Sequence, residues 1–230
     1  MINFKTLRIN QKKIEPFLFY LAVHAFFCLI LLAGRAYLTQ FFGFKFLVWN
    51  LFLGWLPFAF VKIATHYFKK KQIRLYFFFL FFWLLFLPNS FYLITDLVHL
   101  EERLPVPYMY DIFLIFSFVL NGVMAGMYTI FKVRSQIRSR FKQFIHPFWI
   151  LFLFVLIGFG VYLGRFSRWN SWDLFNQPVS VMEDISVRII FPYSNYKTWI
   201  FTAICAISLW IFYKLLATSG VFSQDENAEN

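Results

Sequence analysis

The sequence predicts an all-α fold, a polytopic membrane bundle of about six transmembrane helices, from three observations. The 230-residue chain is 60% hydrophobic and contains 36 phenylalanines. Only 14% of its residues are charged, whereas a soluble domain is usually about 25% charged. The apolar residues form runs long enough to cross a bilayer of about 30 Å as helices. The charged residues lie mainly between these runs.

The six predicted spans cover most of the chain and form one expected domain, residues 1–217. The spans are residues 17–34, 41–64, 75–94, 108–131, 147–164 and 198–217. Basic residues gather before the first span, between the second and third, and between the fourth and fifth. The positive-inside rule therefore places both termini in the cytoplasm. Residues 218–230 read as a disordered acidic cytoplasmic tail.

This topology also explains the basic charge balance. The formal net charge of +11 falls on the predicted inner segments, because the outer segments carry equal numbers of acidic and basic residues. Such a distribution favours contact with anionic lipid of the inner leaflet. A nucleic-acid-binding protein would gather basic and aromatic residues in a soluble element, and no such element is long enough here. We expect membrane lipid as a partner and no nucleic acid.

Two segments differ from plain spans and short connections. Pro88 lies within the third span, removes one backbone donor and predicts a kink. The 33-residue outer segment from Arg165 to Lys197 is too long to serve only as a connection. Within it, Ser180 and Glu183 match a capping box, which predicts a short interfacial helix over about 181–191.

Two pairs of glycines predict close contact between helices. Gly122 and Gly126 in the fourth span and Gly160 and Gly164 in the fifth both form a small-xxx-small pattern. Such patterns let helix backbones approach each other in lipid. We expect the fourth and fifth helices to pack against each other.

Polar side chains are expected to converge at the outer ends of the third, fourth and fifth helices. Asp96 is the most informative, because the helix dipole and poor hydration near lipid both oppose its charge. Either Arg165 or Arg168 neutralises it as an ion pair, or it binds a cation or substrate. The candidate catalytic residues are Asp96, His99 and Asp111. The candidate substrate-binding residues are Asn89, Tyr92, Arg165, Arg168, Asn170, Trp172 and Asp173.

Two kinds of chemistry fit this set. In the first, His99 is a general base oriented by Asp96, and Arg165 and Arg168 hold a phosphate or carboxylate group. The reaction would be hydrolysis or group transfer on an anionic envelope or lipid head-group substrate. In the second, Asp96 and His99 bind a divalent metal ion, with Asp111 or Asp173 as a third ligand. The neighbouring arginines would repel that ion, so a metal cofactor is possible but not favoured.

A structural role is the alternative to both. Asp111 and Arg165 occupy helix ends where the dipole favours their charges, and Trp172 fits an interfacial aromatic belt. The outer cluster would then only tie helix ends together, in a transporter or an accessory subunit of another membrane protein. Mid-span, Asn50 and Asn121 are the polar candidates, and the absence of charge there argues against ion transport.

Several motifs resemble a bacterial membrane-protein family, domain of unknown function 1361. These motifs are the run from Pro88 to Leu97, Tyr110-Asp111, Asn121-Gly122, Gly164-Arg165 and the string from Arg168 to Asp173. The resemblance extends from about residue 20 to 215. It implies a multi-pass protein of the bacterial cytoplasmic (inner) membrane with no established activity, so a mechanism has to be argued from the residues.

Overall fold

The computed structural model describes residues 5–101, 105–140 and 147–219 of the chain. Regular structure in this part of the chain is entirely helical. The predicted fold class is confirmed, because six helices are long and apolar enough to cross a membrane. From residue 220 onward, the predicted acidic tail lies outside the described residues.

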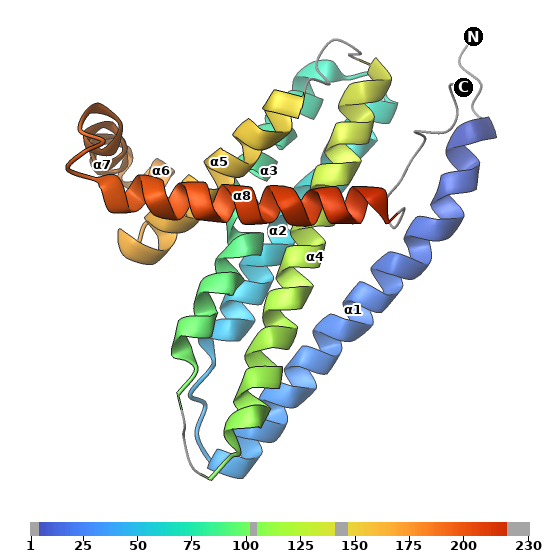
Figure 1. The fold of residues 1–230 in the computed structure, drawn as a ribbon. Coiled ribbons are helices and arrows are strands. Elements are labelled where there is room, and N and C mark those ends of the chain that lie inside the picture. Colours follow the sequence, from blue (N-terminus) through green and yellow to red (C-terminus); the bar gives the residue numbers. More distant parts are fainter. Residues whose placement is uncertain (1–4, 102–104, 141–146, 220–230) are drawn as a thin grey trace.

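The first four long helices alternate in direction and form an elongated bundle (Figure 1). They are α1 (Lys5–Thr39), α2 (Phe46–Lys69), α3 (Ile73–Tyr92) and α4 (Tyr108–Arg140). A 3-10 helix, η1 (Leu93–His99), continues directly from α3. The remaining helices are α5 (Pro147–Phe166), α6 (Asp173–Asn176), α7 (Pro178–Ile190) and α8 (Tyr196–Thr218).

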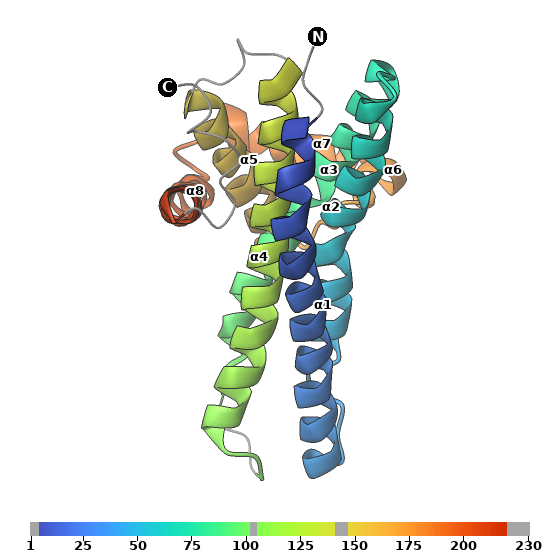
Figure 2. The ribbon, with the colours of Figure 1, turned by 90° about the vertical axis from the view of Figure 1, so that its right-hand side faces the viewer.

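Helices α5 and α8 are attached to one side of this bundle. α5 packs against α3, and α8 packs mainly against α5. α8 lies across the long axis of the bundle, because it runs across Figure 1 and is seen nearly end-on in Figure 2. The end of α8 returns to α4, where the Tyr213 and Phe131 rings stack with their centroids 4.5 Å apart.

Glycines from three helices surround the end of α3 at Pro88–Leu93. A Cβ atom on Gly122 would lie 2.8 Å from the Ser90 carbonyl oxygen, and one on Gly160 would lie 2.6 Å from the Pro88 ring. The other glycines that contact this segment are Gly54, Gly126 and Gly164. The predicted contact between the two glycine pairs is therefore wrong. Each pair packs against α3, because both α4 and α5 approach that helix.

The structure also bears on two local expectations. The α-helix continues through Pro88 without a break and changes to a 3-10 helix only at Leu93, while the predicted kink stays a prediction. The interfacial helix α7 exists, but it begins at Pro178 without a side-chain cap, so Ser180 does not start it. A proline at the first helical position already has a helical φ and needs no backbone donor, which explains the earlier start.

Candidate functional site

The end of α3 and η1 place the third-helix candidates. A 3-10 helix has about three residues per turn, so side chains three residues apart lie one above the other. Asp96 and His99 are spaced in this way and share one side of η1. Asp96 is completely buried, with 0% of its surface exposed. His99 is half-buried, and its ring lies 4.7 Å from the ring of Phe46 on α2, measured between centroids.

The buried Asp96 carboxylate is only partly satisfied. Its Oδ2 accepts a hydrogen bond of 2.8 Å from Nδ2 of Asn50 on α2. Its Oδ1 accepts no hydrogen bond, although Nη1 of Arg165 on α5 lies 3.8 Å away. The expected compensating arginine is thus present, at ion-pair distance but beyond hydrogen-bond distance.

Arg165 connects the three candidates of the third helix. Its Nη2 lies 3.2 Å from His99 Nε2, and its Nη1 donates a 3.4 Å hydrogen bond to the Tyr92 hydroxyl. Arginine stays protonated in proteins, so His99 Nε2 is the acceptor and Nδ1 carries the proton. The Arg165 side chain remains 20% exposed. The contacts of Arg165 are therefore long, and its side chain is partly open to the surroundings.

One predicted relationship inside this cluster differs from expectation. Asp96 was expected to orient His99, but the described residues show no hydrogen bond between the two. Each interacts instead with Arg165, through Nη1 for Asp96 and Nη2 for His99. Arg165 is therefore the common partner of the acid and the imidazole.

Asn50 belongs to the site and was missed as a site residue. The sequence placed it mid-span, because the second apolar run starts well before it. In the structure α2 starts at Phe46, so Asn50 lies in its second turn. α2 and α3 are antiparallel neighbours, so the start of α2 lies beside the end of α3. The later start of α2, at Phe46 rather than residue 41, was the information that would have found Asn50.

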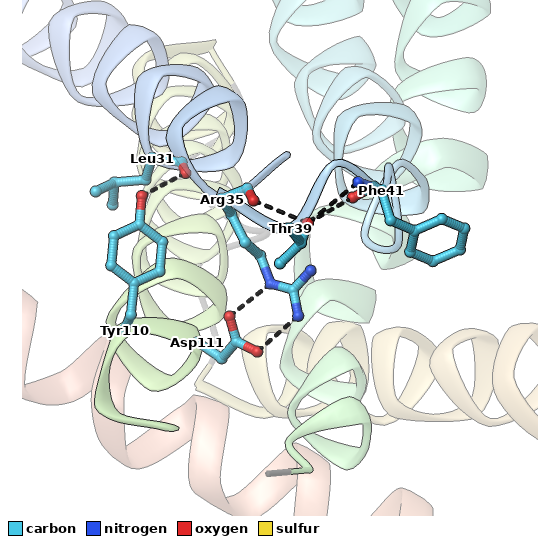
Figure 3. A network of polar contacts seen from close by, with 6 residues as sticks. All are labelled: Leu31, Arg35, Thr39, Phe41, Tyr110 and Asp111. Carbon is cyan, nitrogen blue, oxygen red and sulfur yellow. Dashed lines mark hydrogen bonds and ion pairs between the residues drawn. The ribbon is translucent and has the colours of Figure 1, made fainter. Parts of the chain in front are cut away.

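Asp111 does not join this site. Arg35 on α1 donates to both of its carboxylate oxygens, from Nε at 2.6 Å and from Nη2 at 2.9 Å. The Arg35 guanidinium carbon also lies 4.1 Å from the centroid of the Phe44 ring. Figure 3 shows this closed pair beside Tyr110, whose hydroxyl donates to the Leu31 carbonyl at 2.6 Å.

The reason is the length of the connection before α4. Figure 1 shows α4 beginning farther along the bundle than the segment that ends α3 and η1. The first turn of α4 therefore reaches the end of α1, where Arg35 is available. The prediction that Asp111 lies beside Asp96 is wrong, and its structural interpretation as an ion-pair partner fits the geometry.

The segment after α5 folds back against α2 and α3. Ser171 accepts a 3.0 Å hydrogen bond from Asn89 Nδ2 and donates one of 3.1 Å to the Leu85 carbonyl. Trp172 packs against Trp49 of α2, with ring centroids 6.1 Å apart. Asn89 and Trp172, both predicted to bind substrate, therefore hold this segment in place.

The other three residues predicted in this segment have separate positions. Asp173 Oδ2 accepts hydrogen bonds from the backbone nitrogen and Nδ2 of Asn170, at 2.7 and 3.1 Å. These two residues thus form a local turn before α6. Arg168 is exposed and has a left-handed backbone, with φ of 60°. Its side chain is available at the same surface segment as Arg165.

A network around Asp184 fixes α7 to the end of α5. Asp184 accepts a 3.0 Å hydrogen bond from Trp169 Nε1 and pairs with Arg188 at 2.9 Å. Arg188 also donates to Ser167 and Thr198. Burial raises the pKa of Asp184, but hydrogen bonds from Arg188, Trp169 and Ser167 outweigh it and leave the pKa below its usual value.

The proposed metal ligands are not brought together. Among the described residues, no group of three or more histidine, cysteine, aspartate or glutamate side chains has a geometry that could hold an ion. Asp96 and His99 share Arg165, while Asp111 and Asp173 bind Arg35 and Asn170. Neither Asp111 nor Asp173 therefore joins Asp96 and His99 as the third ligand that the metal alternative required.

The midplane candidate Asn121 is used in helix contacts. Its Oδ1 accepts a 2.8 Å hydrogen bond from Trp55 Nε1, and its Nδ2 donates to the Leu21 carbonyl at 2.9 Å. Its Nδ2 also lies 3.1 Å from His24 Nδ1. Asn121 thus joins α1, α2 and α4, as expected for an asparagine within a membrane bundle.

Comparison with known proteins gives a family and no named relative. The family model described as "Protein of unknown function (DUF1361)" matches residues 49–212, which include Asn50, Asp96, His99 and Arg165. No curated protein and no solved structure matches the chain. The match covers well over half of the chain and agrees with the resemblance seen in its motifs. The chain belongs to the DUF1361 family.

Proposed function

We propose that this multi-pass membrane protein binds the phosphate of a lipid or other envelope head group at its outer face and acts on it as a hydrolase or group transferase. Arg165 is the principal binding group, and the exposed Arg168 adds a second positive charge. The bacterial inner membrane, implied by the resemblance, is the proposed location. Membrane lipid is the proposed substrate source.

The observation that carries the proposal is the incomplete coordination of Arg165. Its contacts with His99, Tyr92 and Asp96 are 3.2, 3.4 and 3.8 Å long. A guanidinium normally lies about 2.7–2.9 Å from a carboxylate oxygen that it hydrogen-bonds, so the charged partner, Asp96, is the one held least closely. The donors of Arg165 therefore retain capacity for an anion, and phosphate is an acceptor that matches the fork of a guanidinium.

His99 and Asp96 give the site its acid–base groups. When phosphate binds Arg165, Nε2 of His99 loses the hydrogen bond from Arg165. It can then accept a proton from water or an acceptor alcohol. The oxygen of that molecule then forms a bond to phosphorus, the ester bond to the leaving group breaks, and His99 returns the proton to the leaving oxygen. Arg165 compensates the negative charge on the phosphate.

Transport is the less supported alternative. The hydrogen bonds of Asn121 to Trp55 and Leu21 use this midplane group to join helices. At the ends of α3 and α5, by contrast, Asp96 Oδ1 accepts no hydrogen bond and Arg165 is partly exposed. This distribution favours chemistry at the surface over a polar path through the bundle.

Binding is tested first, with purified full-length protein in detergent and water-soluble dihexanoyl phosphatidylglycerol as the probe. We expect Arg165→Gln to weaken binding by at least about tenfold, since a charge-assisted hydrogen bond contributes roughly that much or more. Lys197→Gln is the matched control, because it removes an exposed positive charge from the same outer segment. Equal binding by the Arg165 variant and the control would disprove the proposed site.

Catalysis is tested separately by phosphorus NMR of phospholipid liposomes that contain the protein. We expect a new phosphorus signal from released or transferred head group, and we expect its formation to be lost in His99→Gln. Lys197→Gln again serves as the control and should retain the activity. A product formed at the same rate by the His99 variant would contradict its role as the base.

A further inference from the structure

The burial of Asp96 restricts which phosphate compounds the site can accept. The carboxylate is completely buried, and Oδ1 has no hydrogen-bond donor. Arg165 is its cationic partner, at 3.8 Å from this oxygen. Asn50 donates to the other oxygen and carries no charge. How well the negative charge of Asp96 is compensated therefore depends on where the Arg165 guanidinium lies.

A simple anion would compete with Asp96 for this guanidinium. If phosphate draws Arg165 toward itself, the Asp96 carboxylate keeps only its hydrogen bond from Asn50. A buried carboxylate that loses its opposite charge is destabilised, because neither solvent nor protein replaces the lost interaction. More negative charge on the ligand increases this competition and does not relieve it.

A ligand with its own donor avoids this penalty. If a hydroxyl or ammonium group lies next to the phosphate, the phosphate can bind Arg165 while that group donates a hydrogen bond to Oδ1 of Asp96. We infer that the site selects a phospholipid head group that carries a hydrogen-bond donor beside its phosphate. This inference rests on the proposed function and narrows its substrate class.

The chemistry separates common head groups into two sets. Phosphatidylglycerol supplies hydroxyl groups and phosphatidylethanolamine supplies an ammonium group next to the phosphate. Phosphatidylcholine has no N–H or O–H donor in its head group, and phosphatidate has a more highly charged phosphate with no neighbouring donor. Attraction to Arg165 alone would favour phosphatidate. Selection by Asp96 as well as Arg165 favours the two lipids that carry a donor, phosphatidylglycerol and phosphatidylethanolamine.

The test measures the affinity of the full-length protein in detergent for the dihexanoyl forms of these four lipids at pH 8. We expect phosphatidylglycerol and phosphatidylethanolamine to bind at least about tenfold more tightly than the other two, because each donor forms a hydrogen bond to a charged acceptor. This series needs no substitution, so it does not depend on whether any variant folds.

Asp96→Asn then tests the assigned cause, since it removes the charge and keeps the size of the side chain. We expect the preference to fall below about threefold and phosphatidate to bind more tightly than it binds the unmodified protein. Lys197→Gln should keep the original order of affinities. Phosphatidate binding as tightly as phosphatidylglycerol in the unmodified protein would overturn the inference, as would full selectivity in Asp96→Asn.

These outcomes are separable from failure of the proposed function. If selectivity is absent but Arg165→Gln still weakens binding of all four lipids, the phosphate site stands and the donor requirement is wrong. If Arg165→Gln leaves every affinity unchanged, both the site and the inference fail.

Discussion

Among the residues that the structure describes, two arginine–aspartate pairs link different helices, and they differ in how fully their atoms are used. Arg35 and Asp111 join α1 to α4 through two short hydrogen bonds, and their side chains are only 4% and 1% exposed. Arg165 and Asp96 approach no closer than 3.8 Å, and Arg165 is 20% exposed. The first geometry suits a helix connection. The second leaves donors and an acceptor available, which is why the functional proposal rests there.

The largest expected effect on stability comes from breaking the closed pair of Arg35 and Asp111. Asp111→Ala should lower the free energy of unfolding by roughly 3–5 kcal/mol, because it leaves the buried Arg35 guanidinium without a partner. Thermal unfolding in detergent measures this effect. The double variant Arg35→Met with Asp111→Leu should recover most of the loss. A single variant that unfolds like the unmodified protein would show that the pair does not stabilise the bundle.

The next effect tests the packing of α4 against the end of α3, close to the open pair of Arg165 and Asp96. Gly122→Ala should cost about 1–3 kcal/mol, because the added Cβ would meet the Ser90 carbonyl oxygen at 2.8 Å and require the backbone to move. Ser117→Ala on the same helix is the control, since the Ser117 hydroxyl bonds only within its own helix. Equal unfolding temperatures for the two variants would contradict the close packing.

A smaller effect is expected when the open pair is broken. Arg165→Gln should cost about 1–2 kcal/mol, because Asp96 loses its cationic partner, but that partner is partly exposed and lies 3.8 Å from the carboxylate. The same unfolding measurement applies. A loss as large as that of Asp111→Ala would mean that the two pairs have the same structural role, and the comparison would fail.

The smallest effect concerns the Asp184 network, which lies outside the spans. Hydrogen bonds outweigh burial and hold the pKa of Asp184 below its ordinary value of 3.8, so its ionised form stabilises the folded state. This contribution is present above pH 3.8 and is lost as the pH falls through the lower folded-state pKa. Asp184→Asn should therefore cost about 0.5–1 kcal/mol at pH 7. The difference from the unmodified protein should shrink as the pH falls below 3.8, and a difference independent of pH would rule out this explanation.

The sequence predicted the helices well because membrane spans follow from composition and length. Every predicted span corresponds to a long helix, although the ends differ by up to nine residues, as at Arg140 of α4. Partner choice was harder to predict, because it depends on which helices are neighbours. The glycine pairs identified two close-packing surfaces correctly, but the helix that both contact, α3, carries no glycine in its final turns.

The candidate site was predicted in part for the same reason. Tyr92, Asp96 and His99 lie together because local helical spacing fixes them, and Arg165 was expected as a partner from the charge of Asp96. Asn50 could not be assigned without the true start of α2. Asp111 was misplaced because helix ends were assumed to lie at one depth, whereas α4 begins beyond η1.

The contact between α5 and α3 also has a consequence for how fast the site can respond. Gly160 lies against the Pro88 ring and Gly164 against the Tyr92 ring, so the backbone before Arg165 has little room to slide along α3. Arg165 must then change partners by rotating its own side chain. Partly exposed side chains rotate within picoseconds to nanoseconds, whereas helix shifts take microseconds or longer. Exchange of head groups at the proposed phosphate site would therefore not have to wait for a shift of the helices.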